Sequence, residues 1–155
     1  MNSKYLSIYN NLIQLTRNKS LYVNYTDKET FSDRLTMFFL HFAFFLKTYK
    51  NKSSKKNVQD LYDFIFKQIE LSIREIGYGD QSINKKMKDY INLFHSMVSE
   101  IHFWDNLSKS DKLNKISFFL SDFQNNEELL EYFDLFNSNL SKKTLNSYLK
   151  SVRNP

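Results

Sequence analysis

The residues of this chain that could do chemistry gather around its only two glycines, Gly77 and Gly79, which are separated by one tyrosine. Glycine permits positive φ and close approach of another backbone, so a chain that uses it nowhere else has a specific turn here, in which we expect Gly77 or Gly79 to have positive φ. Asp80 follows directly, and Lys85 and Lys86 come a few residues later. Amides at a helix N-terminus with lysines nearby could bind an anion or an acidic peptide. The residues alone leave open the alternative of a purely structural glycine stop followed by a helix cap.

The charges beside this turn oppose the dipoles of the helices that we expect on either side. Glu75 lies at the negative end of the preceding helix, and Lys85, Lys86 and Lys88 crowd the positive end of the following one. Each such placement costs about a few tenths of a kcal/mol. Residues that break local rules are more often functional, so we take the turn as a candidate partner-binding site.

Three histidines are the next candidates. His95 and His102 border the same helix face seven residues apart, where they could share a metal or haem. No carboxylate cluster supports them, and histidines at the edge of a core explain the pattern more simply. His41 lies in an apolar, Phe-rich stretch and is expected in the core.

The chain offers no recognisable catalytic centre. It has no cysteine, which excludes disulfides, thiolate nucleophiles and cysteine-based metal sites. No serine, histidine and acid occur at a known catalytic spacing, and a Gly-x-Gly between two helices is not a dinucleotide fingerprint, which needs a preceding strand. We therefore expect a protein that is not an enzyme, with no cofactor and no metal.

The net charge is +5, which indicates an anionic partner such as nucleic acid. Five lysines between positions 47 and 56 form a basic connector, whereas residues 121–140 carry five acidic residues and no lysine or arginine. A basic helical module that binds nucleic acid or the ribosome is therefore the alternative function. It predicts steeply salt-dependent RNA affinity.

Apolar residues recur at helical spacing throughout, and no stretch alternates long enough for a strand. We predict an all-α fold, a single domain over residues 1–155 that is a bundle of about seven helices. The expected segments are 5–15, 26–49, 58–76, 83–104, 110–123, 127–140 and 142–152.

The third and fourth segments are the longest amphipathic ones and should form an antiparallel helical hairpin with the glycine turn at its tip. Thr26, Ser110 and Ser141 are the expected N-caps, with Glu29 completing a capping box. The most buried positions of the hairpin should be Leu61, Ile65, Ile69, Tyr90, Ile91 and Phe94.

The second segment is almost wholly apolar from Leu35 to Leu46. Twelve residues are too few for a membrane span, which needs about 20. The first interpretation is a central helix that other helices cover on all sides. The second leaves part of the Phe-rich surface open for an apolar client.

The stretch from Leu61 to Lys88 resembles the signature of the ubiquinol-cytochrome c chaperone family. The family pattern is an aromatic-rich helix, then Arg-Glu, an apolar residue, Gly-x-Gly-Asp and Lys-Lys, and the chain matches it with Arg74-Glu75-Ile76-Gly77-Tyr78-Gly79-Asp80 and Lys85-Lys86. Upstream, Thr30-Phe31-Ser32-Asp33-Arg34-Leu35 and Leu40-His41 resemble an earlier family segment. The likeness covers roughly residues 20–104. It departs where the family usually has an aromatic pair followed by Gly and Arg, since this chain has Phe94-His95-Ser96-Met97.

The resemblance implies an all-helical, non-catalytic assembly factor of respiratory complex III that engages newly made cytochrome b. It also implies a small helical co-chaperone or the ribosome as further partners. The start of the chain lacks the features of a signal peptide, so a bacterial-type member should be cytoplasmic and peripheral on the inner face of the membrane. The partner-binding residues carried over from the signature are Arg74, Glu75, Gly77, Gly79, Asp80, Lys85 and Lys86.

Overall fold

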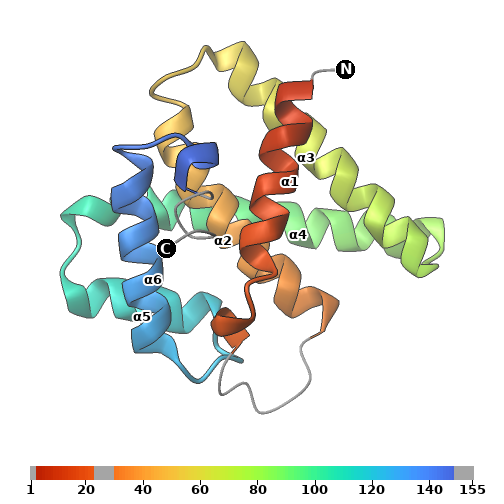
Figure 1. The fold of residues 1–155 in the computed structure, drawn as a ribbon. Helices are drawn as coiled ribbons and strands as arrows, with labels where there is room; N and C mark the ends of the chain where they lie inside the picture. The colour runs from red at the N-terminus through yellow and green to blue at the C-terminus, as the bar shows by residue number, and fades with distance from the viewer. Residues whose placement is uncertain (1–2, 23–29, 149–155) are drawn as a thin grey trace.

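The computed structural model describes residues 3–22 and 30–148. Within them the chain forms only helices, which confirms the predicted all-α class (Figure 1). The elements are α1 (Ser3–Thr16), the 3-10 helix η1 (Lys19–Tyr22), α2 (Phe31–Tyr49), α3 (Lys55–Ile76), α4 (Asp80–Ile101), the 3-10 helix η2 (Trp104–Asn106), α5 (Lys109–Phe119) and α6 (Asn126–Leu140). Residues 145–148 are also helical and open the segment that we predicted over 142–152.

Helix α2 is the centre of the molecule. Its apolar residues occur on every side, so it needs cover on every side, and α1, α4 and α6 all pack against it (Figure 1). The Phe42 ring stacks on Phe94 of α4 with centroids 4.7 Å apart, and Phe44 stacks on Phe133 of α6 at 5.4 Å. Every residue from Met37 to Leu46 is buried. The enclosed-helix interpretation is therefore confirmed, and the alternative of an open Phe-rich surface on α2 is wrong.

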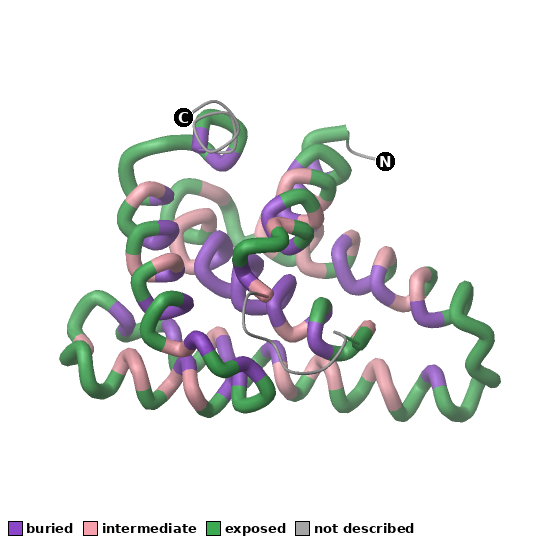
Figure 2. The backbone as a smooth tube through the Cα atoms, turned by 60° about the horizontal axis from the view of Figure 1, so that its bottom comes forward, coloured by how far each residue is buried: buried purple, intermediate pink, exposed green. Residues whose placement is uncertain are grey.

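Helices α3 and α4 run in opposite directions from the glycine turn and diverge away from it (Figure 2). The ring of Phe39 on α2 lies 5.7 Å from Phe66 on α3 and 5.4 Å from Phe94 on α4. Because α2 inserts aromatic rings between the two arms, they form an open V whose tip projects from the bundle. The residues around the tip are exposed, whereas the buried residues gather where the arms meet α2 (Figure 2).

Four of the six predicted core positions of the hairpin are buried, namely Leu61, Ile65, Ile69 and Phe94. Tyr90 and Ile91 are only half-buried, so their prediction is wrong. The reason is that α4 turns a neighbouring stripe toward the core, made of Phe94, Met97 and Ile101. Tyr90 lies at the edge of that stripe, and its hydroxyl is 3.0 Å from the Ser32 hydroxyl.

The helix caps differ from the predicted ones. The Thr26 cap lies outside the described residues, and α2 begins at Phe31 behind a capping box of Thr30 and Asp33. The cap of α5 is Ser108, because Ser110 already lies inside the first turn. After α6, the Thr144 hydroxyl accepts from the Ser147 amide at 3.1 Å, which is the contact that we expected from Ser141. Ser141 instead donates back to the Asn137 carbonyl at 3.3 Å.

Polar contacts fix the corner between α4 and α5 to the rest of the bundle. The Trp104 indole and the Lys112 ammonium both donate to one oxygen of Asp134 on α6, each at 2.9 Å. The Lys47 ammonium of α2 donates to Asp105 at 2.7 Å, and this pairing lowers the pKa of Asp105. Part of the acidic stretch and part of the basic connector are thus used to hold the fold together.

Candidate partner-binding site at the α3–α4 turn

The turn owes its shape to one of its two glycines. Gly77 ends α3 in the left-handed region, with φ 104° and ψ 18°, and its amide donates to the Arg74 carbonyl at 3.0 Å. This confirms the prediction that one glycine has positive φ. Gly79 has φ −72° and ψ 162°, which any residue can adopt. A Cβ atom built on Gly79 would meet no heavy atom within 4 Å, so the space in front of its backbone is open.

Arg74 ties the two sides of the turn together. Its guanidinium donates to Asp80 at 2.9 Å and lies 3.7 Å from the Glu70 carboxylate one turn back along α3. The Asp80 hydrogen bond and the Glu70 charge raise the pKa of Arg74, which therefore stays protonated. Because Arg74 and Asp80 are exposed and Glu70 is only half-buried, this arrangement adds little to stability and leaves carboxylate and guanidinium edges available to a partner.

Two apolar side chains stand beside these charges. Ile76 is 51% exposed and Tyr78 is 43% exposed, although Ile76 follows the buried Ile73 by three residues along α3. Ile76 is exposed because α3 ends there, beyond the reach of α1 and α2. The Lys86 ammonium lies 4.5 Å from the centre of the Tyr78 ring, in a cation–π contact. The tip thus combines an aromatic ring, an exposed aliphatic side chain and both signs of charge.

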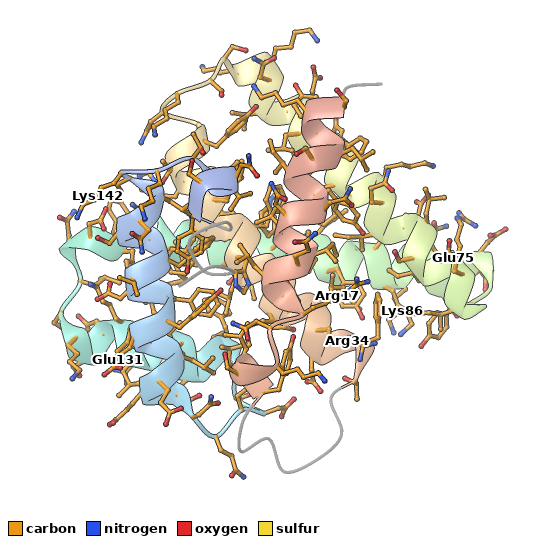
Figure 3. All side chains as sticks on the ribbon, in the orientation of Figure 1. Arg17, Arg34, Glu75, Lys86, Glu131 and Lys142 are labelled. Carbon is orange, nitrogen blue, oxygen red and sulfur yellow. The ribbon has the colours of Figure 1, made fainter. Side chains whose placement is uncertain are left out.

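The structure brings some of the predicted site residues together and leaves others apart. Arg74 and Asp80 are paired across the turn, and Lys86 covers Tyr78. Glu75 and Lys85 are exposed, and neither makes an ion pair within the described parts of the chain. Figure 3 shows Glu75 at the end of α3 and Lys86 on the side of the tip that faces the start of α2.

The first turn of α4 gives the tip a second polar feature. Its N-cap is Gly79, which has no side chain to bond the first amides, and Asp80 is the acidic residue in this turn. Helix N-termini attract negative groups through their amides and their dipole. Lys85 and Lys86 add positive charge one turn later, so an acidic group of a partner would be attracted to this edge.

A cavity of about 240 Å³ adjoins the site between α1, α2 and α3. Phe38 and Ile69 form part of its apolar wall, and Arg17 and Arg34 line its edge (Figure 3). Arg17 is an exposed residue directly after the end of α1, and nothing in the spacing of the sequence marks it as a pocket residue.

The three histidines are accounted for by the packing. His95 accepts or donates a 2.9 Å hydrogen bond with the Tyr62 hydroxyl, and His102 lies 3.5 Å from the Lys50 ammonium. No group of histidine, aspartate and glutamate side chains within residues 3–22 and 30–148 could hold a metal ion.

His41 is fully buried in α2. Its Nδ1 lies 2.8 Å from the Met37 carbonyl, which can only accept, so Nδ1 carries the proton and Nε2 accepts from the Tyr132 hydroxyl at 2.7 Å. Burial lowers the pKa of His41 to about 4. This histidine therefore links α2 to α6 as a neutral core residue.

No helix in the described parts of the chain is long and apolar enough to cross a bilayer.

Comparison with known families places the site in context. A family model described as Ubiquinol-cytochrome C chaperone matches residues 24–102. This range contains α2, α3, the turn and α4, and it ends one residue after α4. No curated protein and no solved structure matches the chain.

The matched residues divide into two groups in the structure. The aromatic and aliphatic residues of the signature, among them Phe66, Ile69 and Ile73, are buried. The Arg-Glu, Gly-x-Gly-Asp and Lys-Lys residues lie at or beside the turn, and all of them except the half-buried Lys86 are exposed. Because the match covers half of the chain and includes this turn, the chain belongs to the ubiquinol-cytochrome c chaperone family.

Proposed function

We propose that this protein is a non-catalytic assembly chaperone of respiratory complex III and that it holds newly made cytochrome b through the α3–α4 turn. The proposed contact residues are Arg74, Glu75, Gly77, Gly79, Asp80, Lys85 and Lys86. Membership of the chaperone family suggests the complex III part of this proposal.

One observation carries the choice of the turn. Among the residues that match the family signature, Phe66, Ile69 and Ile73 serve the core, whereas Ile76 and most of the polar residues around Gly77 and Gly79 are exposed and contribute little to folding. Gly79 in particular is required neither by its φ nor by a neighbouring atom. A partner backbone that approaches Gly79 closely would explain why a glycine stands there.

The tip suits a loop or terminus of a membrane protein more than a membrane-spanning segment. Ile76 and Tyr78 offer a small apolar contact, and the surrounding Arg74, Asp80 and Lys86 offer polar ones. Small apolar contacts surrounded by polar groups are typical of transient interfaces. Such a loop would be met at the inner face of the cytoplasmic membrane, where we propose that the protein works.

The first prediction reverses the charges of the tip with Lys85→Glu and Lys86→Glu together. The variant should remain folded, because both positions lie beyond the first turn of α4 and the lost contact between Lys86 and Tyr78 is worth only about 0.5–1 kcal/mol. Complex III in cells that carry only this variant should fall several-fold. The measurement is the spectroscopic content of cytochrome b and the amount of assembled complex, alongside the melting temperature of the purified variant.

The matched control is Lys19→Glu with Lys109→Glu, which changes the net charge equally at two exposed positions outside the turn. Normal complex III in the Lys85/Lys86 variant would remove the turn from the functional site. A photo-crosslinker at position 76 identifies the partner, and position 135 on α6 serves as a comparison with similar exposure of an apolar side chain. Crosslinks from position 76 to proteins other than complex III subunits would reject cytochrome b as the client.

A further inference from the structure

A second pocket lies on the opposite side of α1 from the turn, between the first half of α1, the end of α2 and the chain that follows α6. It has a volume of about 440 Å³, within the range of pockets that hold small molecules. Its floor is apolar and includes Phe45, Leu140 and Leu145, all of which are buried. The pocket belongs neither to the proposed chaperone site nor to the cavity beside it.

The edge of this pocket is strongly positive. Lys4, Lys52 and Lys143 come from three separate parts of the chain and all line it. No aspartate or glutamate is among the described residues that line it. Lys50 and Lys142 are exposed sequence neighbours of this edge (Figure 3 labels Lys142). An apolar floor inside a ring of lysines is complementary to a molecule with a negative head and an apolar body.

One polar atom of the pocket residues lacks a partner. The Tyr49 hydroxyl is buried, and it has no hydrogen-bond partner within the described residues. The Tyr49 ring stacks on Phe45 with centroids 5.3 Å apart, and the Lys4 ammonium lies 5.6 Å from its centre. A buried hydroxyl without a partner is destabilising, so an oxygen of a bound molecule would improve this position.

We propose that this pocket binds an acidic phospholipid of the membrane surface. The phosphate would lie among Lys4, Lys52 and Lys143, an ester or glycerol oxygen would meet the Tyr49 hydroxyl, and the start of an acyl chain would cover Leu140 and Leu145. Lysines near an anionic bilayer each add attraction, and the pocket gives that attraction a fixed position. The inference is independent of the chaperone assignment.

The apolar floor favours a lipid over the other anions that lysines attract. Free phosphate would leave Phe45 and Leu145 without a contact. Single-stranded RNA is held by a basic groove with exposed aromatic rings for stacking, whereas the aromatic residues here are buried Phe45 and partly buried Tyr49. The pocket therefore favours a lipid over RNA, and binding of RNA is tested as the competing outcome.

The test uses the purified full chain and two measurements. The first is cosedimentation with vesicles of phosphatidylcholine alone or mixed with phosphatidylglycerol. The second is the melting temperature with monomeric dihexanoyl-phosphatidylglycerol, with the matching phosphatidylcholine, or with inorganic phosphate. We expect binding only to the mixed vesicles, and a rise of about 5 °C or more at saturating short-chain phosphatidylglycerol. Equal responses to both lipids, or to phosphate alone, would overturn the proposal.

Two variants locate the binding. Lys52→Glu with Lys143→Glu should weaken vesicle binding by about tenfold or more, whereas Lys19→Glu with Lys109→Glu, which changes the net charge equally, should leave it within about twofold. Tyr49→Phe should melt at the same or a higher temperature without lipid and should lose most of the shift with phosphatidylglycerol.

Three results contradict the assignment. An equal loss of vesicle binding in the two double lysine variants would show that the effect comes from net charge alone. An unchanged rise in melting temperature with phosphatidylglycerol in Tyr49→Phe would exclude this pocket. Binding of an RNA oligonucleotide that depends on Lys52 and Lys143, without binding to mixed vesicles, would identify a nucleic-acid surface instead.

Discussion

At the scale of single residues, the two glycines of the turn illustrate what a sequence can and cannot predict. Their isolation predicted a left-handed residue, and Gly77 is that residue. Which of the two it would be depends on where α3 stops, and this is set by the packing of Ile73 against the core. The open space at Gly79 could not be predicted, because it concerns atoms that are far away in the sequence.

The difference between the glycines can be measured. Gly77→Ala should destabilise the protein by about 1 kcal/mol, because alanine is strained at φ 104°. Gly79→Ala should change stability by less than about 0.5 kcal/mol, because the freedom lost by the unfolded chain is offset by the poor N-cap preference of alanine at the start of α4. Urea unfolding of both variants gives the comparison. Equal costs at both positions would contradict the assignment of the turn to Gly77.

His41 predicts how stability depends on pH. Its pKa is lowered to about 4 in the folded state by burial, against about 6.5 in the unfolded chain. Below pH 6.5 the unfolded state therefore binds the extra proton, so stability is complete above that pH and falls toward pH 4. Between these two pKa values, the contribution of His41 to the slope of the free energy of unfolding against pH approaches about 1.4 kcal/mol per pH unit.

The measurement for His41 is urea unfolding between pH 7.5 and 5, with NMR titration of the histidine rings. His41→Gln keeps polar contacts available to Met37 and Tyr132 and should be less stable at neutral pH but show a shallower slope below it. A His41 ring that titrates near 6.5 in the folded protein would refute the lowered pKa.

At the scale of helices, periodicity predicted where each one lies better than where it begins. The segment predicted over 58–76 became α3, and the segment over 83–104 became α4 with its start three residues earlier. The first residue of a helix depends on its cap residue. Ser108 and Ser110 lie two positions apart and are the same residue type, so the sequence does not distinguish them as caps. Ser108 is the cap in the structure, where its hydroxyl accepts from the Asp111 amide three residues later.

This cap gives a direct comparison. Ser108→Ala should cost about 1 kcal/mol, because its hydroxyl accepts from the Asp111 amide at 3.1 Å. Ser110→Ala, which removes an exposed hydroxyl inside the helix, should change stability by less than about 0.5 kcal/mol. Thermal unfolding of the two variants is sufficient. A larger loss at Ser110 would restore the cap that the sequence suggested.

At the scale of the whole molecule, the sequence predicted an all-helical fold and a hairpin, but not the V shape of that hairpin. The rings of α2 that part the two arms belong to a different segment, and nothing in the spacing of α3 or α4 records them. The same limit applies to both pockets. Arg17 with Arg34, and Lys4 with Lys143, come together only through the packing of helices that are distant in sequence.

The bond between His41 and Tyr132 joins residues 91 positions apart, and this separation has a consequence for how the protein is made. Ribosomes add about 5–20 residues per second, so α2 emerges roughly 5–20 s before the helix that covers its far side. During that interval the nascent chain presents an uncovered stretch of phenylalanines to the cell. We therefore expect this member of a chaperone family to need shielding of its own until α6 has been synthesised.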